Sequence, residues 1–277
     1  MIILDRYAVF GDPIGHSKSP KIHQLFAEQT GQSLQYTAER VPAAQFATAA
    51  NTFFTEGGKG LNCTIPLKEL AWHYADHKTP RAQRSGAVNT LALQADGSVL
   101  GDNTDGIGLV TDLIHNHGIT LKERSILILG AGGASRGIIE PILEQSPQRL
   151  VIANRTVDKA VELAQVFGHL GPISGCGFDD LLTQQFDLII NATSTSLSGE
   201  LPPLPENLLA KNGYCYDLAY SNQSTTFVRW GLANNALKSL DGLGMLVEQA
   251  AAAFYIWRKV TPATQSVITL MNSQRGL

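Results

Sequence analysis

The segment Ser125–Gly137, SILILGAGGASRG, restricts the possible folds more than any other part of this chain. Its apolar run stops at closely spaced glycines, and a helical pattern from Ala134 to about Gln145 follows. In doubly wound α/β folds, a strand, a glycine turn and a helix N-terminus in this order bind the pyrophosphate of a dinucleotide. The fingerprint is matched only in part, because Ser135 stands where Gly or Ala is usual. An ordinary structural turn is therefore the alternative.

The next strand, Arg149–Ala153, points to the identity of the dinucleotide. NAD-binding proteins usually place an acidic residue after this strand, whereas NADP-binding proteins offer cations to the 2'-phosphate. This chain has Arg155 there, and an arginine can hold a phosphate through two parallel hydrogen bonds. The sequence therefore predicts NADP rather than NAD, although the nearby Asp158 leaves a solvated basic loop as the alternative.

Composition limits the classes of partner and compartment. The 277 residues, of which 44% are hydrophobic, are enough for two domains, and a net charge of -3 offers no general attraction to nucleic acid or to a membrane. We expect a small-molecule substrate and a cytoplasmic location, because no signal peptide is recognisable. Three cysteines without CxxC spacing are expected to be reduced, and no bound metal is expected, although His73 and His77 are four residues apart.

Alternating strand and helix patterns predict an α/β protein with two domains and a cleft between them. In the first domain a hairpin signal at Ala95–Gly97 adds antiparallel strands, so its mainly parallel sheet is expected to be mixed. The second domain is expected to be a Rossmann-like doubly wound unit. Two helical patterns after Gly242 are expected to return to the first domain. The predicted boundaries are 1–105 plus 241–277 for the substrate domain and 106–240 for the dinucleotide domain.

Polar residues gather in four strings of the first domain, each expected at the end of a predicted strand. Ligands bind at the strand ends of open α/β sheets, so these groups can converge on one molecule. Hydroxyls and amides suit a polyhydroxylated substrate such as a sugar-like or hydroxylated ring acid. The strings are GDPIGHSKSP at 11–20, NCTIPLKE at 62–69, GAVNT at 86–90 and DNTDG at 102–106.

Together with GAGGASRG, NRT, NATS and DGLGMLVEQAA, these strings make the chain resemble the shikimate dehydrogenases over nearly its whole length. The motifs differ in chemistry and occur in the family's order, which makes the resemblance specific. It implies NADP-linked reduction of 3-dehydroshikimate to shikimate in the pathway to aromatic amino acids.

The resemblance also implies roles for individual residues. Lys68 and Asp105 resemble the catalytic pair. Ser17 and Ser19 resemble the groups that hold the substrate carboxylate, and the groups around the ring hydroxyls are Asn62, Thr64, Asn89, Asp105, Tyr220 and Gln249. On the cofactor side, the pyrophosphate loop is Gly130, Ala131, Gly132, Gly133 and Ala134; the adenosine phosphate site is Asn154, Arg155, Thr156 and Lys159; and the nicotinamide surroundings are Thr193, Leu218, Gly242 and Met245.

The catalytic pair can also be argued from chemistry. When hydride reaches a carbonyl carbon, negative charge builds on oxygen, and a cation that can give up a proton stabilises it. Lys68 can do both, and Asp105 can hold it or share the proton transfer. Alternatively, Lys68 begins an exposed helical turn and Asp105 only caps a helix. Ser19 is expected to cap the helix from Pro20 to Gln29, and His16 is expected to be structural.

Three other functions remain open from the sequence. The first is a quinate or shikimate dehydrogenase that uses NAD. The second is a sensor that binds shikimate-like ligands without catalysing a reaction. Such a protein could lose Lys68 or Asp105 and keep its fold, so the presence of both residues argues against it. The third is a different dehydrogenase on the same fold. The expected assembly is a monomer or a homodimer.

Overall fold

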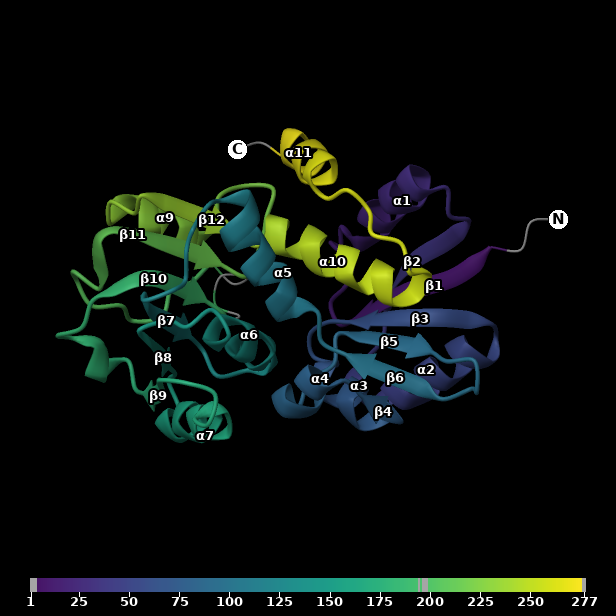
Figure 1. Ribbon diagram of the computed structural model, residues 1–277, viewed down its shortest axis with the longest axis horizontal. Coiled ribbons are helices and arrows are strands. Elements are labelled where there is room, and N and C mark those ends of the chain that lie inside the picture. Colours follow the sequence, from purple (N-terminus) through teal and green to yellow (C-terminus); the bar gives the residue numbers. More distant parts are fainter. Residues whose placement is uncertain (1–3, 194, 196–198, 276–277) are drawn as a thin grey trace. The chain divides into compact units, whose positions relative to one another are not determined.

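The computed structural model describes residues 4–193, 195 and 199–275, so Ser194 of the NATS string lies outside the described part of the chain. The chain divides into two compact units (Figure 1). The first unit comprises Met1–Gly108 and Leu246–Thr269, and the second comprises Leu109–Met245 and Leu270–Leu277.

The first unit contains a six-stranded mixed sheet in the order β2-β1-β3-β5-β6-β4. The hairpin of β5 and β6 is antiparallel, as predicted, and β5 also runs antiparallel to β3. The other strand pairs in this sheet are parallel. The strands are β1 (Asp5–Gly11), β2 (Leu34–Arg40), β3 (Gly58–Cys63), β4 (His77–Lys78), β5 (Thr90–Leu93) and β6 (Val99–Asp102).

Alternation along β1 distributes its side chains to two buried faces. Ala8 and Phe10 join a core with Phe53 and Leu61, whereas Tyr7 faces Trp257 with ring centroids 4.7 Å apart. This explains the continuous apolar run of β1, since a strand covered on both sides needs no polar face. The helices are α1 (Ser19–Thr30), α2 (Phe46–Thr55), α3 (Lys68–Tyr74), α4 (Pro80–Ser85), α5 (Asp105–Thr111) and α10 (Leu243–Arg258).

The second unit contains a six-stranded parallel sheet in the order β12-β11-β10-β7-β8-β9. Counted from β7, this is the 3-2-1-4-5-6 order of dinucleotide-binding folds, and the order reverses between β7 and β10. The strands are β7 (Ser125–Leu129), β8 (Arg149–Ala153), β9 (Ile173–Cys176), β10 (Phe186–Asn191), β11 (Leu209–Asp217) and β12 (Lys238–Asp241).

Both faces of this sheet are buried, which accounts for the apolar run of β7. Ile126 and Ile128 pack into one core, whereas Leu127 and Leu129 pack into a second core on the opposite face. The helices are α6 (Gly133–Leu143), α7 (Val157–Phe167) and α9 (Thr226–Ala233). The helix α11 (Gln265–Ser273), like α5 and α10, has residues in both units.

Several local expectations require correction. Ser19 is the first residue of α1 rather than its cap, and Lys18 occupies the cap position without a side-chain cap. A 3₁₀ turn, Ala43–Gln45, precedes α2. The helix that starts at Asp105 ends at Thr111, and a π-helical turn, Asp112–Asn116, follows it. His77 lies in β4, so it does not share a helix with His73.

Two compositional expectations can also be compared with the described residues. Cys63, Cys176 and Cys215 are free thiols, as predicted. Within the ranges that the structure describes, no helix is long and apolar enough to span a membrane.

Candidate active site

The four polar strings of the first unit lie at one edge of its sheet. Those at 11–20 and 102–106 follow the carboxyl ends of β1 and β6, and the one at 62–69 begins at the end of β3. The string at 86–90 instead leads into β5. Because β5 runs antiparallel to its neighbours, its beginning lies at the edge where the other three strands end.

Lys68 and Asp105 form an ion pair at this edge, through Lys68 Nζ and Asp105 Oδ2. They begin α3 and α5. Their side chains are only 15% and 7% exposed, so the alternative of an exposed helical turn at Lys68 is wrong. A partly buried ammonium held against a carboxylate can act as a directed proton donor.

Asn89 connects this pair to the returning helix α10. Its Nδ2 donates to Asp105 Oδ1 at 2.9 Å and to Gln249 Oε1 at 3.2 Å. Its Oδ1 accepts from the backbone N–H of Thr104 at 2.9 Å. One amide therefore joins three distant segments of the sequence, those of Asn89, Asp105 and Gln249.

Asn62 lies beside this group and is anchored by residues that sequence reasoning missed. Its Oδ1 accepts from the Tyr36 hydroxyl at 2.6 Å, and its Nδ2 donates to Asn89 O and Thr90 Oγ1, each at 3.1 Å. Thr90 was inside a quoted string but had no assigned role. Tyr36 offered no motif, because β2 meets β3 only through the intervening β1.

The backbone of Asp105 is held by a second network. Asp102 accepts hydrogen bonds from Arg81 Nε and Nη2 at 2.6 Å each, and from the Asn103 N–H at 2.7 Å. Asn103 Oδ1 in turn accepts from the Asp105 N–H at 3.1 Å. Arg81 thus fixes the DNTDG turn without contacting Lys68 or Asp105.

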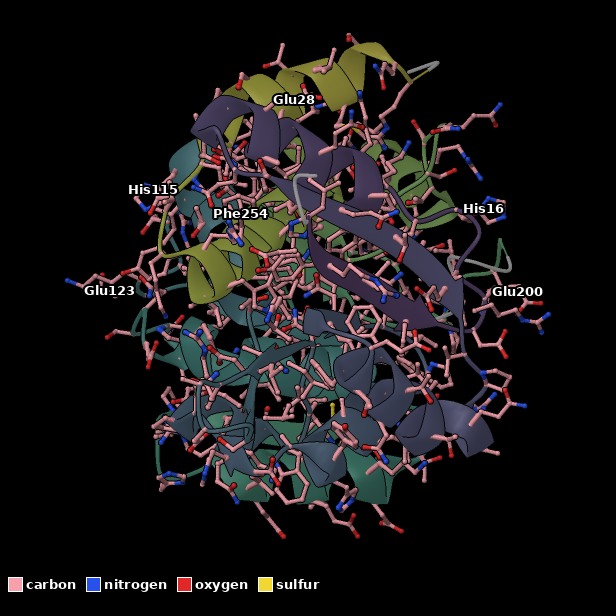
Figure 2. All side chains as sticks on the ribbon, turned by 90° about the vertical axis from the view of Figure 1, so that its right-hand side faces the viewer. His16, Glu28, His115, Glu123, Glu200 and Phe254 are labelled. Carbon is pink, nitrogen blue, oxygen red and sulfur yellow. The ribbon has the colours of Figure 1, made fainter. Side chains whose placement is uncertain are left out.

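The candidate carboxylate site is less elaborate. The Ser19 N–H donates to Ser17 Oγ at 3.3 Å, and Thr64 follows β3 with its N–H bonded to Phe10 O. His16 is exposed (Figure 2), and its structural role stays a prediction.

Cys63 is a buried thiol next to these groups. Burial raises the pKa of Cys63, and the charge of Lys68 only partly opposes that shift. The thiol therefore stays protonated and is no nucleophile.

His23 of α1 is a buried titratable group behind Asn62. It is 1% exposed, and burial lowers its pKa from 6.5 to about 3, with a hydrogen bond to the Asn62 side chain acting in the opposite direction. Its Nε2 has no partner among the described residues. The imidazole is therefore neutral at any working pH.

This histidine should make the fold sensitive to acid. The pKa of His23 is lower in the folded protein than in the unfolded one, so the unfolded protein binds a proton first as the pH falls. The free energy of unfolding is therefore not reduced by this group above pH 6.5, and it decreases as the pH falls from 6.5 toward 3. The loss is about 1.4 kcal/mol per pH unit. We expect the free energy of unfolding in urea to fall by about 2 kcal/mol more for the wild type than for His23→Phe between pH 6.5 and pH 5. Equal losses in both proteins would contradict the assignment.

In the second unit, the glycine turn has the geometry of a phosphate loop. Gly130 has φ 103°, and a Cβ there would lie 3.2 Å from Ala192 O, so only glycine fits. The unusual Ser135 is 0% exposed and donates from Oγ to Gly130 O at 2.7 Å. The serine that replaces the usual Gly or Ala thus stabilises the turn through this hydrogen bond. Residues Ala131, Gly132, Gly133 and Ala134 connect the turn to α6.

A pocket of about 200 Å³ adjoins this turn and collects the predicted adenosine phosphate residues. Arg155 and Lys159 are exposed, and among the described residues neither has an ion-pair partner, Asp158 included. Two unpaired cations beside a glycine turn fit a phosphate ester. The pocket is lined by Ala131, Gly132, Asn154, Arg155, Thr156 and Lys159.

The remaining cofactor candidates lie at the carboxyl edge of the same sheet. Thr193 follows β10, and its Oγ1 donates to Asn191 Oδ1 at 2.7 Å. Leu218 and Gly242 follow β11 and β12, and a Cβ on Gly242 would lie 2.2 Å from Leu218 O. The Met245 N–H donates to the Tyr216 hydroxyl at 3.3 Å. Tyr220 also belongs to this unit, whereas the other substrate candidates belong to the first.

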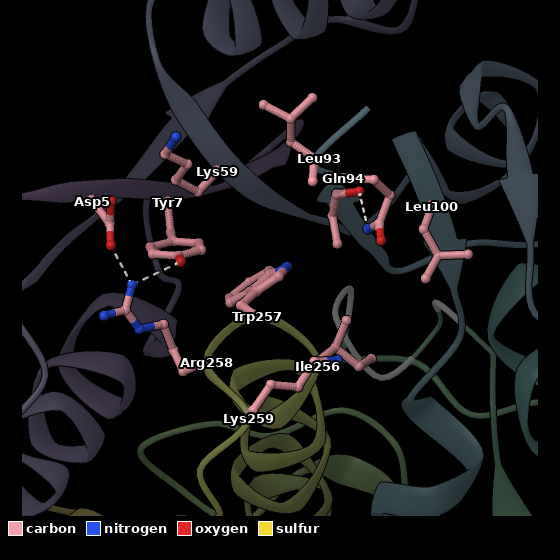
Figure 3. Close-up of a pocket in the computed structure, with 12 residues that line it drawn as sticks. Asp5, Tyr7, Lys59, Leu93, Gln94, Leu100, Ile256, Trp257, Arg258 and Lys259 are labelled. Atoms are coloured by element: carbon pink, nitrogen blue, oxygen red, sulfur yellow. Dashed lines mark hydrogen bonds and ion pairs between the residues drawn. The ribbon is translucent and has the colours of Figure 1, made fainter. Parts of the chain in front are cut away.

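Another pocket, of about 350 Å³, lies at the opposite edge of the first sheet (Figure 3). Tyr7, Trp257 and Arg258 line it, but Arg258 is already bonded to Asp5 and, at 2.7 Å, to Gln32 Oε1. The candidate catalytic residues are not among its lining residues. The chemistry of this unit is therefore concentrated at the Lys68 edge.

Comparison with known proteins agrees with the chemistry of both units. Residues 9–91 match the family model of the shikimate dehydrogenase substrate binding domain, 112–198 that of shikimate / quinate 5-dehydrogenase, and 242–270 that of the shikimate 5'-dehydrogenase C-terminal domain. A shikimate dehydrogenase (NADP(+)) of Methylococcus capsulatus is 61% identical over 98% of this chain and 97% of that protein.

Solved structures show the same similarity. An Ael1 enzyme from Pseudomonas putida is 45% identical, with a TM-score of 0.87 over 96% of this chain and 97% of that one. A shikimate 5-dehydrogenase of Thermus thermophilus in complex with NADP(H) and shikimate is 33% identical, with a TM-score of 0.86 over 98% of this chain and 100% of that one. The chain therefore belongs to the shikimate dehydrogenase family.

Proposed function

We propose that this protein catalyses the reversible NADP-dependent reduction of 3-dehydroshikimate to shikimate. The observation that carries the proposal is the partly buried Lys68–Asp105 ion pair, with the amides of Asn62, Asn89 and Gln249 in the same hydrogen-bond network. Relatives with the same family assignment are named NADP-dependent shikimate dehydrogenases. In this proposal residues 1–105 and 241–277 bind the substrate, and residues 106–240 bind NADP.

Lys68 is the proton donor for the substrate oxygen. As the carbonyl is reduced, its oxygen gains negative charge, which the Lys68 ammonium stabilises before giving it a proton. Asp105 holds the ammonium in direction through Oδ2, while its Oδ1 is kept in place by Asn89. In the reverse direction the pair accepts the proton from the alcohol.

Substrate recognition uses hydroxyl and amide groups. Ser17 and Ser19 bind the carboxylate near the N-terminus of α1, where the helix dipole favours an anion. The ring hydroxyls are bound by Asn62, Thr64, Asn89, Asp105 and Gln249, and by Tyr220 of the second unit. A site that pairs each hydroxyl rejects analogues that lack one.

The second unit binds NADP, which supplies the hydride when it is bound. Gly130 and its neighbours hold the pyrophosphate at the start of α6, and Arg155 and Lys159 neutralise the 2'-phosphate. Thr193, Leu218, Gly242 and Met245 form the surroundings of the nicotinamide. The cytoplasmic location and the monomeric or dimeric state stay predictions.

The test is the consumption of NADPH by the purified protein with 3-dehydroshikimate, followed by chromatographic identification of the product. We expect NADPH absorbance to fall with formation of shikimate in equal amount. Binding of shikimate without NADPH consumption would contradict the proposal and favour a sensor.

A further inference from the structure

A continuous series of side-chain hydrogen bonds runs from Tyr36 of β2 to Asp105, and up to Asp105 every donor in it points the same way. Tyr36 donates to Asn62, and Asn62 donates to Thr90. Thr90 Oγ1 then donates to Asn89 Oδ1 at 2.8 Å, and Asn89 Nδ2 donates to Asp105 Oδ1. The series ends where Asp105 Oδ2 accepts from Lys68.

The direction of the series is fixed by two backbone groups. The Thr104 N–H can only donate, so Asn89 must turn its Oδ1 toward it and its Nδ2 toward Asp105. Asn89 O can only accept, so Asn62 must present its Nδ2 there and to Thr90. The Thr90 hydroxyl is left with one arrangement, accepting from Asn62 and donating to Asn89.

The residues of this series are buried, so the loss of one hydrogen bond is expected to disturb its neighbours. Thr90 is 0% exposed, and Asn62 and Asn89 are 6% and 3% exposed. A buried polar group that loses its partner cannot be compensated by water, and bonds in such a network reinforce one another. The far end is rigid as well, since the Tyr36 ring stacks on His23 with centroids 4.1 Å apart and planes 7° apart.

We propose that Thr90 and Tyr36 are positioning residues of the reaction, which orient the Asn62 and Asn89 amides and, through Asn89, the Asp105 carboxylate that directs Lys68. Neither residue needs to touch the substrate or the reacting atoms. The inference rests on the proposed function, because it concerns the catalytic pair of that reaction.

The first test replaces Thr90 by two residues that differ in the hydroxyl. Thr90→Val keeps the branched shape but leaves Asn62 Nδ2 without this acceptor and Asn89 Oδ1 without this donor, whereas Thr90→Ser keeps both bonds. We expect kcat for shikimate oxidation to fall about tenfold in Thr90→Val. We expect Thr90→Ser to stay within about twofold of the wild type, and KM for NADP to be unchanged in both. Equal losses in both variants would mean that packing of the methyl group, rather than the hydroxyl, is responsible, and would overturn the proposal.

The second test measures coupling along the series. Tyr36→Phe keeps the ring on His23 and removes only the hydroxyl, and we expect kcat to fall severalfold. Thr90→Val removes one of the two connections between Asn62 and Asn89, the bond to Asn89 O being the other. We therefore expect the Tyr36→Phe/Thr90→Val double variant to be slower than Thr90→Val by less than the full effect of Tyr36→Phe in the wild type. Multiplied losses in the double variant would contradict a connected series.

Tyr74→Phe is the matched control. The Tyr74 hydroxyl donates to Asn51 Oδ1 at 2.8 Å, an exposed tyrosine–asparagine bond outside the series. Its loss should leave kcat unchanged. If the wild type does not oxidise shikimate, the proposed function itself fails, whereas normal turnover in both wild type and Thr90→Val removes only the positioning role.

Discussion

Replacement of Lys68 by alanine is expected to lower kcat for shikimate oxidation by about 10³-fold, with KM for shikimate changed only severalfold. The ammonium stabilises charge that exists only in the transition state, and positioned proton transfer contributes roughly 10² to 10⁴ in rate. The ring hydroxyls and the carboxylate keep their other partners in this variant. The loss therefore falls on turnover rather than on binding.

Steady-state kinetics at saturating NADP would measure this effect, with Lys59→Ala as the matched control. Lys59 is an exposed lysine on β3, at the opposite end of the strand that leads to Lys68. Near-normal kcat in Lys68→Ala would remove Lys68 from the mechanism. A rise in KM with unchanged kcat would instead make it a binding residue.

Replacement of Arg155 by aspartate is expected to raise KM for NADP about 100-fold and to leave KM for NAD nearly unchanged. A well-formed charge-assisted hydrogen bond contributes roughly 1.5 to 3 kcal/mol, and the new carboxylate would also repel the phosphate. NAD lacks the 2'-phosphate, so it neither uses the arginine nor meets that repulsion. The preference for NADP over NAD should therefore collapse.

The matched control for this change is Lys122→Asp, the same charge reversal at an exposed residue of the second unit that does not line the phosphate pocket. It should leave both constants unchanged, which separates local contact from the general electrostatic field. An equal weakening of NADP and NAD by Arg155→Asp would show that the residue supports the loop rather than the phosphate.

The fold of the second unit followed closely from its sequence. The β7 run, the glycine turn and the start of α6 were predicted within one residue, because a strand buried on both faces and a turn that requires Gly130 leave few alternatives. Short elements were missed, among them β4 and β9. Two to four residues carry too little periodicity to be recognised, and pairing with neighbouring strands defines them.

The candidate site was predictable where it lies in strings beside strands, and unpredictable where it depends on register. Lys68 and Asp105 are 37 residues apart, yet the strand-end rule brings both to one edge. Tyr36 meets Asn62 only because β1 aligns β2 and β3, which no local pattern encodes. Ser19 was wrongly predicted to be the cap of α1. A proline usually marks the first position of a helix, but α1 starts one residue before Pro20, at Ser19.

The most direct test of the central claim is the rate of NADPH formation when the protein is mixed with shikimate or quinate, each with NADP or NAD. We predict rapid formation of reduced cofactor with shikimate and NADP, and at most slow reaction in the other three combinations. Comparable rates with NAD or with quinate would contradict the assigned specificity. No reaction in any combination, from folded protein that still binds shikimate, would contradict the assignment of Lys68 and Asp105 as a catalytic pair.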